Sequence, residues 1–267
     1  MQRHDVPIDD PSAPPARLRS VRVLGVPIHA VDWPSALNTI SHWASRRESR
    51  SVCICNVHSV VTASQLAEFR AAIEQADIAT PDGAPVAWML RRLGVARQER
   101  ISGPDLMRKY CELAASRHEG IFLLGGTDDM LERLQRTLRS EFPGLHIAGT
   151  CSPPFRPLSA QEDEAIVAQI NASGAGVVWV GLGCPKQELW MHAHRGRVHA
   201  VMVGVGAAFP FLAGTVRRAP LWMQQTGLEW LHRLASEPRR LWRRYTVTNS
   251  YFIVGALGQL CRRLLTR

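Results

Sequence analysis

Short apolar runs alternate with longer amphipathic stretches along most of the chain. The apolar runs predict strands at 21–25, 51–55, 77–80, 121–125, 146–150, 177–183 and 200–206. Apolar residues at helical spacing predict helices at 32–47, 104–117, 128–142 and 159–173. Asp32 stands at an N-cap position, and Pro34 falls in the first turn that follows it. The alternation predicts an α/β fold, a Rossmann-like, mostly parallel sheet with helices on both faces.

Three of the predicted strands end in unusual residues. Asp82 and Gly83 follow the strand at 77–80, Gly125-Gly126 closes the next one, and 181–188 has the sequence GLGCPKQE. Ligands of such sheets bind beyond the carboxyl ends of the strands, where small residues and helix N-termini favour phosphate. Neither the Walker A spacing nor a GxGxxG after the first strand is present, which argues against a dinucleotide-dependent oxidoreductase.

Positive charge is concentrated at the C-terminal end. The chain has a net charge of +9, and residues 217–267 hold ten Arg, no Lys and two acidic residues. Three Trp are interspersed there, and Pro238 can begin a helix with Arg at i,i+4 spacing. Such an end predicts a phosphate-bearing partner, which is a nucleic acid, an anionic lipid or a diphosphate substrate. The apolar stretch 251–260, flanked by Arg, suits either a membrane interface or a core helix.

These patterns divide the chain into three parts. Residues 1–19 form a polar, Pro-rich leader, residues 20–215 the α/β domain, and residues 216–267 a basic helical appendage. The leader lacks the apolar centre of a secretory signal, and no apolar run is long enough to span a membrane. The six Cys form no CxxC pair, which predicts reduced thiols in a cytoplasmic protein.

Several motifs occur together in one order. They are PDGAPVAWMLRRLG, ERISGPDLM, IFLLGGTDDMLERL, FPGLHIAGTCSPPF, WVGLGCPKQELW and the long segment from VGVGAAFPFL to EPRRLWRRY. Over roughly residues 20–245 the chain closely resembles the WecG/TagA/CpsF family of bacterial glycosyltransferases. The resemblance implies transfer of a sugar, commonly N-acetylmannosamine or a related hexose, from a UDP-sugar to a polyprenyl-diphosphate-linked saccharide. It also implies cell-surface polysaccharide synthesis, peripheral binding to the inner face of the plasma membrane and self-association.

The resemblance assigns roles to residues of the body. It implies that Asp82 is the catalytic base, although this carboxylate could also be a turn or capping residue. Asn56 and Arg100 match pocket residues, for which the alternatives are a strand-terminating Asn and a surface Arg. The nucleotide and sugar site would be completed by Gly125, Gly126, Gly181, Gly183, Lys186, Gln187 and Glu188.

The resemblance also gives the appendage a role. It implies that the lipid diphosphate and anionic headgroups bind Arg217, Arg218, Arg233, Arg239, Arg240, Arg243 and Arg244. The chain has no D-x-D motif, so we expect neither an essential metal ion nor a cofactor. Ala84-Pro85 departs from the family pattern and leaves the donor sugar open. The alternative is a basic protein that binds nucleic acid or a membrane without transferase activity, and we expect no nucleic-acid partner.

Overall fold

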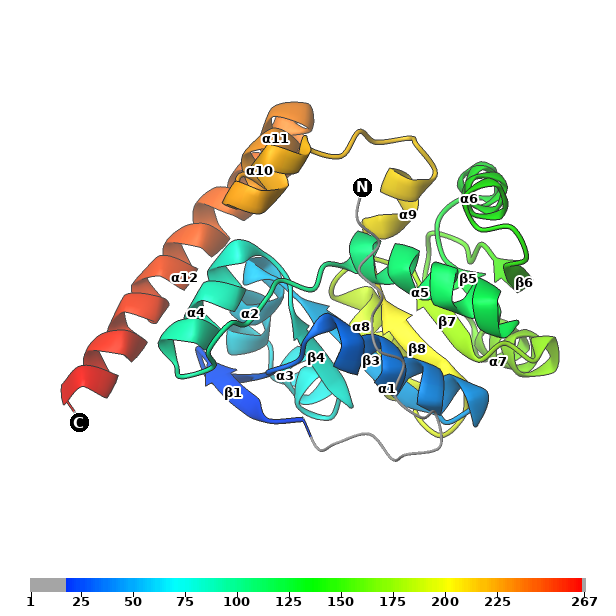
Figure 1. Ribbon diagram of the computed structural model, residues 1–267, viewed down its shortest axis with the longest axis horizontal. Helices are drawn as coiled ribbons and strands as arrows, with labels where there is room; N and C mark the ends of the chain where they lie inside the picture. The colour runs from blue at the N-terminus through cyan, green and yellow to red at the C-terminus, as the bar shows by residue number, and fades with distance from the viewer. Residues whose placement is uncertain (1–17, 266–267) are drawn as a thin grey trace.

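The computed structural model describes residues 18–265, apart from the side chains of Arg240 and Arg244 (Figure 1). Most of the predicted leader, residues 1–17, lies outside the described residues, as do residues 266 and 267. Six parallel strands form the main sheet in the order β4-β3-β8-β7-β5-β6. They are β3 (Arg50–Cys55), β4 (Ile78–Pro81), β5 (Gly120–Leu124), β6 (His146–Cys151), β7 (Val177–Val180) and β8 (Val201–Gly204).

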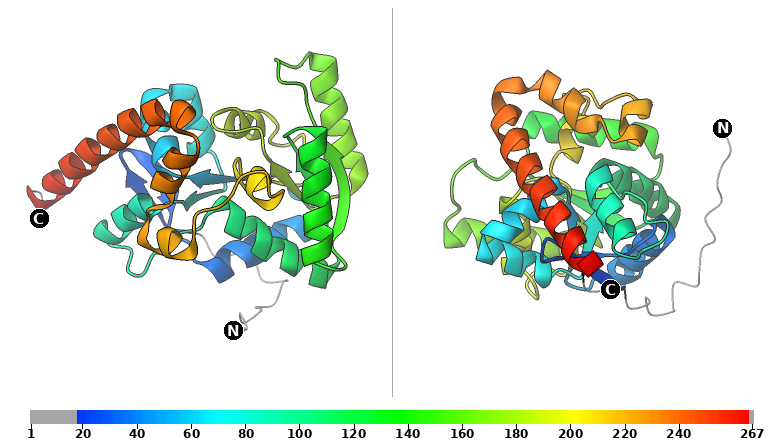
Figure 2. Two further views of the ribbon diagram at one scale, coloured as in Figure 1. Left: turned by 90° about the horizontal axis from the view of Figure 1, so that it is seen from above. Right: turned by 90° about the vertical axis from the view of Figure 1, so that its left-hand side faces the viewer.

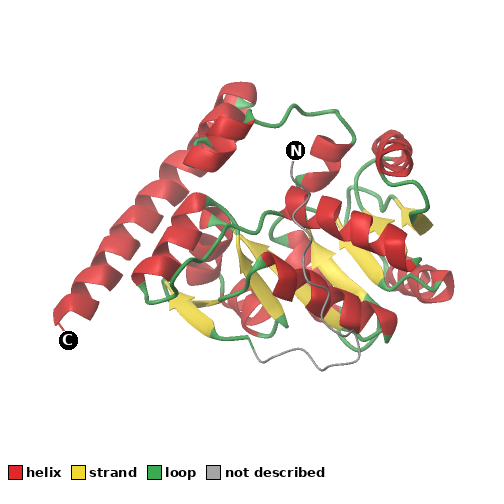
Figure 3. Ribbon diagram, viewed as in Figure 1, coloured by secondary structure: helices red, strands yellow, loops and turns green. Residues whose placement is uncertain are grey.

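Helices cover both faces of this sheet, as predicted (Figures 1 and 3). Alternate strand residues point to opposite faces, so Val177 and Trp179 join one buried cluster while Val178 and Val180 join the other. The first cluster includes residues of α1 (Trp33–Ser45), α5 (Gly103–Arg117), α6 (Asp128–Glu141) and α9 (Ala208–Leu212). The second includes residues of α2 (Val57–Gln65), α3 (Ala67–Glu74), α4 (Ala84–Arg92), α7 (Ala160–Ser173) and α8 (Lys186–Ala193).

The predicted cap at Asp32 is confirmed. Its Oδ1 accepts a hydrogen bond from the N–H of Ser35 at 2.9 Å, and Pro34 lies in the first turn of α1. The side-chain oxygen satisfies an N–H that the helix itself leaves without a partner. Here a short sequence pattern was sufficient to fix the start of a helix.

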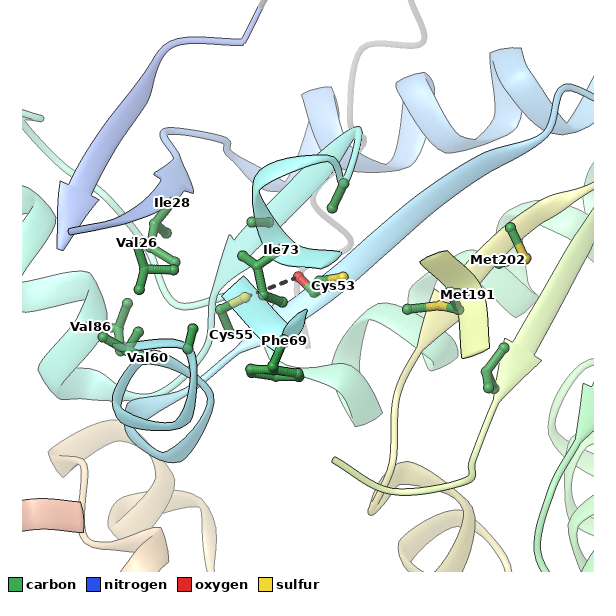
Figure 4. Close-up of a cluster of buried hydrophobic side chains, with 14 of the residues drawn as sticks. Val26, Ile28, Cys53, Cys55, Val60, Phe69, Ile73, Val86, Met191 and Met202 are labelled. Atoms are coloured by element: carbon green, nitrogen blue, oxygen red, sulfur yellow. Dashed lines mark hydrogen bonds between the residues drawn. The ribbon is translucent and has the colours of Figure 1, made fainter. Parts of the chain in front are cut away.

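The predicted strand at 21–25 lies outside the main sheet. It is β1 (Ser20–Val23), which pairs antiparallel with β2 (Val26–His29) through a turn at Leu24 and Gly25. Sequence analysis missed β2 because Pro27 interrupts its apolar pattern. The hairpin lies beside the β4 edge, where Nδ1 of His29 accepts a hydrogen bond from the N–H of Ala79 at 2.9 Å. Its Val26 and Ile28 belong to the buried cluster that also contains Val60 and Val86 (Figure 4).

The C-terminal appendage, residues 216–265 as described, contains three helices. They are α10 (Leu221–Thr226), α11 (Glu229–Ser236) and α12 (Pro238–Leu265). The stretch 251–260 is not a separate segment but the second half of α12, which begins at Pro238 as predicted. Figure 2 shows α12 running along one side of the molecule to the β1–β2 hairpin. None of the helices between residues 18 and 265 combines enough length and apolar character to span a bilayer.

Side chains of α12 attach it to the body at both ends of its length. Leu241, Phe252 and Ala256 are buried along the face that lies against the body, and α12 packs on α2. Near the other end, the side chain of Gln259 accepts a hydrogen bond from the N–H of Leu24 at 2.9 Å and donates one to the carbonyl of Arg22 at 2.7 Å. The last helix is therefore bound to the first hairpin.

Candidate active site

A cavity of about 1470 Å³ lies beyond the carboxyl ends of the parallel strands. The chain passes from β3 outward to β4 and then crosses to β5 on the other side of β7 and β8, which is the switch in strand order that opens a crevice in α/β sheets. The cavity is walled by the segments that follow all six strands of the sheet and by parts of α9, α11 and α12. The body and the appendage thus share one site.

Asp82 lines this cavity directly after β4. Its N–H donates a hydrogen bond to the carbonyl of Cys55 at the end of β3, at 3.0 Å. Gly83, with φ of 82°, occupies the cap position of α4, so Asp82 is not the capping residue of that helix. Burial raises the pKa of Asp82 to about 6, although the charge of Arg100 and a hydrogen bond from the N–H of Gly83 oppose the rise.

Arg100 lies beside Asp82 because its segment is fastened to the end of β4. The N–H of Ile101 donates to the carbonyl of Pro81 at 3.0 Å, and Oγ1 of Thr80 donates to the carbonyl of Ile101 at 3.4 Å. Arg100 also lines the cavity, where its Nη1 lies 2.8 Å from Oε2 of Glu229 on α11. Its guanidinium is thus already paired with a carboxylate from the appendage.

A family model described as glycosyl transferase WecG/TagA/CpsF family matches residues 21–265 of this chain. The chain belongs to that family of glycosyltransferases. The match extends past the motif-based resemblance, which ended near residue 245, and it includes the second half of α12. The long C-terminal helix is therefore part of the family architecture.

Asn56 of this glycosyltransferase has a structural role as well as a place in the cavity wall. Its Oδ1 accepts a hydrogen bond from the N–H of Ser59 at 3.2 Å and caps α2. These contacts show that Asn56 has a structural role between the end of β3 and the start of α2.

The glycines at the strand ends shape the cavity by close backbone approach. A Cβ on Gly125, which has φ of 119°, would lie 2.7 Å from the carbonyl carbon of Gly181. The N–H groups of Gly125 and Gly181 donate to the carbonyls of Cys151 and Leu124, which extend the sheet ladder. Gly126, Gly181 and Gly183 line the cavity, whereas Gly125 supports the turn from outside its wall.

The first turn of α8 brings three predicted residues to the cavity. Lys186 is exposed, whereas Gln187 and Glu188 are almost fully buried. The side chain of Gln187 accepts from the N–H of Gly183 at 3.2 Å and donates to Oε1 of Glu188 at 2.9 Å. These contacts fix the loop after β7, so Gln187 shapes the site as well as lining it.

The predicted basic residues of the appendage occupy different environments. Arg217, Arg239 and Arg243 are exposed, and Arg240 and Arg244 have side chains outside the described part of the chain. Among the described members of the set, only Arg233 lines the cavity, with its guanidinium carbon 5.5 Å from the centre of the Phe211 ring. Arg218 is instead half-buried and bonded to the body.

The contact of Arg218 reveals residues that sequence analysis missed. Its Nη1 and Nη2 lie 2.5 and 2.7 Å from the two carboxylate oxygens of Asp105, and its Nε lies 3.5 Å from Glu229. Burial opposes ionisation of Asp105, yet hydrogen bonds from Arg218 and Ser102 outweigh it and hold the pKa of Asp105 below its usual value. One available clue was that Glu229 is one of only two acidic residues in the Arg-rich segment.

Among residues 18–265, no three His, Cys, Asp or Glu side chains come together as a metal site would require. Other polar and aromatic residues that line the cavity include His58, Ser59, Trp190, Trp230, Tyr245 and Asn249. Among the described residues, the arrangement offers one carboxylate with a raised pKa, several helix N-termini and the guanidinium groups of Arg100, Arg156 and Arg233 around a common space. These are groups that take a proton and neutralise phosphate.

Proposed function

We propose that the protein is an inverting glycosyltransferase that moves a hexose, such as N-acetylmannosamine, from a UDP-sugar to a polyprenyl-diphosphate-linked saccharide. The observation that carries the proposal is Asp82, held at the floor of the shared cavity with a pKa of about 6. Membership of the family supports glycosyl transfer in general. The UDP-sugar, the lipid-linked acceptor and the individual residue roles are our proposals.

In this mechanism Asp82 acts as the general base. The acceptor hydroxyl oxygen attacks the anomeric carbon, its proton passes to the Asp82 carboxylate, and the bond from the sugar to UDP breaks with its electron pair leaving on UDP. A base is most efficient when its pKa lies near the working pH, because it is then ionised yet still basic. An ordinary, fully solvated Asp, with a pKa near 4, is a weaker base.

The size of the cavity supports a reaction between two substrates. Pockets for one small molecule usually have volumes of about 300–1,000 Å³, and this cavity has about 1470 Å³. We place the donor diphosphate at the loops after β5 and β7, where Gly126 and Gly183 bring backbone close to the cavity. The acceptor then approaches from the side of Asp82 and the appendage.

We further propose that the leaving UDP is stabilised by Arg100, Arg233 and helix N-termini without an essential divalent ion. The proposal is motivated by the missing D-x-D motif and by the guanidinium groups of Arg100 and Arg233 in the cavity wall. Activity that EDTA leaves unchanged would support it. Activity abolished by EDTA and restored by Mg²⁺ or Mn²⁺ would refute it.

The appendage provides a surface that suits peripheral membrane binding at the cytoplasmic face, where lipid-linked acceptors are presented. Large apolar side chains are exposed on α10–α12 and include Leu221, Trp222, Trp242, Val247, Tyr251, Val254 and Leu264. Arg217, Arg239 and Arg243 lie exposed among them. Apolar insertion combined with attraction of Arg to anionic lipid is a recognised way to bind an interface reversibly.

The deciding experiment is a transfer assay. Purified protein is incubated with a short-chain GlcNAc-diphosphate-lipid and a panel of UDP-sugars, and released UDP is measured. We expect turnover of one donor, and a loss of about 10²–10⁴-fold in kcat for Asp82→Asn. Asp129→Asn, which removes an exposed carboxylate on α6, is the matched control and should retain full activity. Full activity in Asp82→Asn would refute the role of this residue, and no transfer with any donor would count against the proposed reaction.

A further inference from the structure

Four alternating charges form a closed ring between the body and the appendage. Arg100 lies 2.8 Å from Glu229 and 3.6 Å from Asp105, and Arg218 lies 2.5 Å from Asp105 and 3.5 Å from Glu229. Arg100 and Asp105 belong to the body, whereas Arg218 and Glu229 belong to the appendage. The two closest pairs therefore both cross the boundary, with opposite polarity.

The backbone also brings the appendage directly onto the Asp82 turn. Gly227, with φ of 78°, ends α10, and a Cβ at this position would lie only 2.7 Å from Cβ of Ala84. Ala84 is two residues after Asp82, and Glu229 is two residues after Gly227. The close contact between these two turns fixes Glu229 above the cavity beside Arg100.

The balance of charges in the ring leaves Asp82 without an ion-pair partner. In the ring, the two positive charges of Arg100 and Arg218 balance the two negative charges of Asp105 and Glu229. The carboxylate of Asp82 therefore has no counter-charge of its own in the ring. Among the described residues, no Arg, Lys or His nitrogen lies within the 4.0 Å of an ion pair to Asp82, although the charge of Arg100 acts on it. Asp82 thus stays without an ion-pair partner while a guanidinium lies close by.

We propose that Glu229 is a positioning residue, which retains Arg100 as its ion-pair partner and so leaves Asp82 free to act as the base. The proposal rests on the proposed function. If Glu229 loses its charge, Asp105 is already held by both guanidinium nitrogens of Arg218. Arg100 then keeps only its 3.6 Å contact with Asp105, and Asp82, on which its charge already acts, becomes available as a partner. An ion pair between them would make Asp82 a poor base. The packing of α10 and α11 on the body therefore keeps Asp82 available as the base, because it places Glu229 beside Arg100.

The electrostatic surroundings of Asp82 give the direction of the expected change. Arg100 lowers its pKa, and Glu229 and Asp105 raise it. Arg218 belongs to the ring, and Cys55 lies beside Asp82. The other titratable groups of the cavity wall, among the described residues, are His58, Arg156, Asp163, Cys184, Lys186, Glu188, Arg233, Glu237 and Tyr245. Loss of the Glu229 charge and closer approach of Arg100 both lower the pKa of Asp82, so the two effects have the same sign.

The first test compares pH profiles of transfer. Glu229→Gln should lower kcat about 10-fold or more and should move the acidic limb of the profile to lower pH by about one unit. Glu229→Asp keeps the charge and should recover part of the rate. Glu99→Gln, an exposed carboxylate next to Arg100, is the matched control and should match the parent protein. An unshifted acidic limb in Glu229→Gln would overturn the proposal.

The second test uses suppression. In the double variant Arg100→Gln/Glu229→Gln no guanidinium is released, so Asp82 should again be unpaired. We expect the acidic limb to return toward pH 6, the value of the pKa of Asp82 in the intact ring. The rate of the double variant does not discriminate, because Arg100 is also proposed to stabilise the leaving UDP. An acidic limb that stays where it is in Glu229→Gln would contradict the proposal.

A third readout does not need activity. The effect of Asp82→Asn on the melting temperature is measured from pH 4 to 8, in the parent protein and in Glu229→Gln. The midpoint of this pH dependence lies between the pKa values of Asp82 in the unfolded and the folded protein, so it should fall in the Glu229→Gln background if the folded-state pKa falls. If the midpoint falls but no UDP-sugar is turned over, the proposed function fails while the positioning contact stands. An unmoved midpoint overturns the positioning contact whatever the assay shows.

Discussion

The body and the appendage use large apolar side chains in opposite ways. In the body, Trp179 and Phe209 are fully buried, whereas in the appendage Trp222 and Trp242 are 59% and 55% exposed. The body is stabilised by its two buried clusters. The appendage is attached through a narrow stripe of α12, the charge ring and the hairpin, and most of its apolar surface remains available. The difference is consistent with a body that provides the fold and with our proposal that the appendage provides a surface for membrane binding.

The largest effect should come from breaking the core of the body. Trp179→Ala removes a ring that packs edge-on against Tyr110 at 5.7 Å, and it should lower the free energy of unfolding by about 3–5 kcal/mol. Trp242→Ala in the appendage removes an exposed ring of the same size and should change that free energy by less than about 0.5 kcal/mol. Urea unfolding of the two variants measures the contrast. Similar losses of unfolding free energy in the two variants would show that Trp242 contributes to stability as much as a buried core residue does.

Sequence patterns predicted the parts of this fold that depend on neighbouring residues. The apolar runs of β3–β8 and the cap at Asp32 depend on residues close together in the chain. The charge ring joins Arg100 to Glu229 and Asp105 to Arg218, pairs that lie 129 and 113 residues apart. No local pattern specifies such pairs, because they depend on how the appendage packs. For the same reason, sequence analysis placed Arg218 among the lipid-binding residues, whereas the structure shows it bonded to Asp105.

The next largest effect should come from removing the ionisable carboxyl group of Asp82. The pKa of Asp82 is about 6 in the folded protein and 3.8 as the ordinary value. The Asp82 side chain therefore binds more protons in the folded than in the unfolded protein between these values, and its own contribution to stability decreases as the pH rises from about 4 to 6. Asp82→Asn should consequently stabilise the protein by roughly 1–3 kcal/mol at pH 8, and the gain should vanish near pH 4. Melting curves across this pH range test the sign, and a destabilised Asn variant at pH 8 would contradict it.

The smallest effect should appear at the exposed basic surface of the appendage. Arg239→Gln/Arg243→Gln should weaken binding to vesicles that contain phosphatidylglycerol by about 1 kcal/mol per charge, and it should leave the melting temperature unchanged. Vesicle sedimentation at two salt concentrations measures the loss. Arg133→Gln, on the exposed face of α6, is the control. Equal binding by both variants would remove these two Arg from the proposed membrane surface.

The hydrogen bonds of Gln259 to the β1–β2 turn have a consequence for the order in which the site is assembled. During synthesis the body can fold while the C-terminal residues are still being added, because N-terminal parts of a chain fold first. The hairpin then waits for α12, which follows the body in the chain, and Glu229 can reach Arg100 only after the body has been synthesised. A nascent chain can thus form its sheet before the appendage completes the wall of the proposed active site.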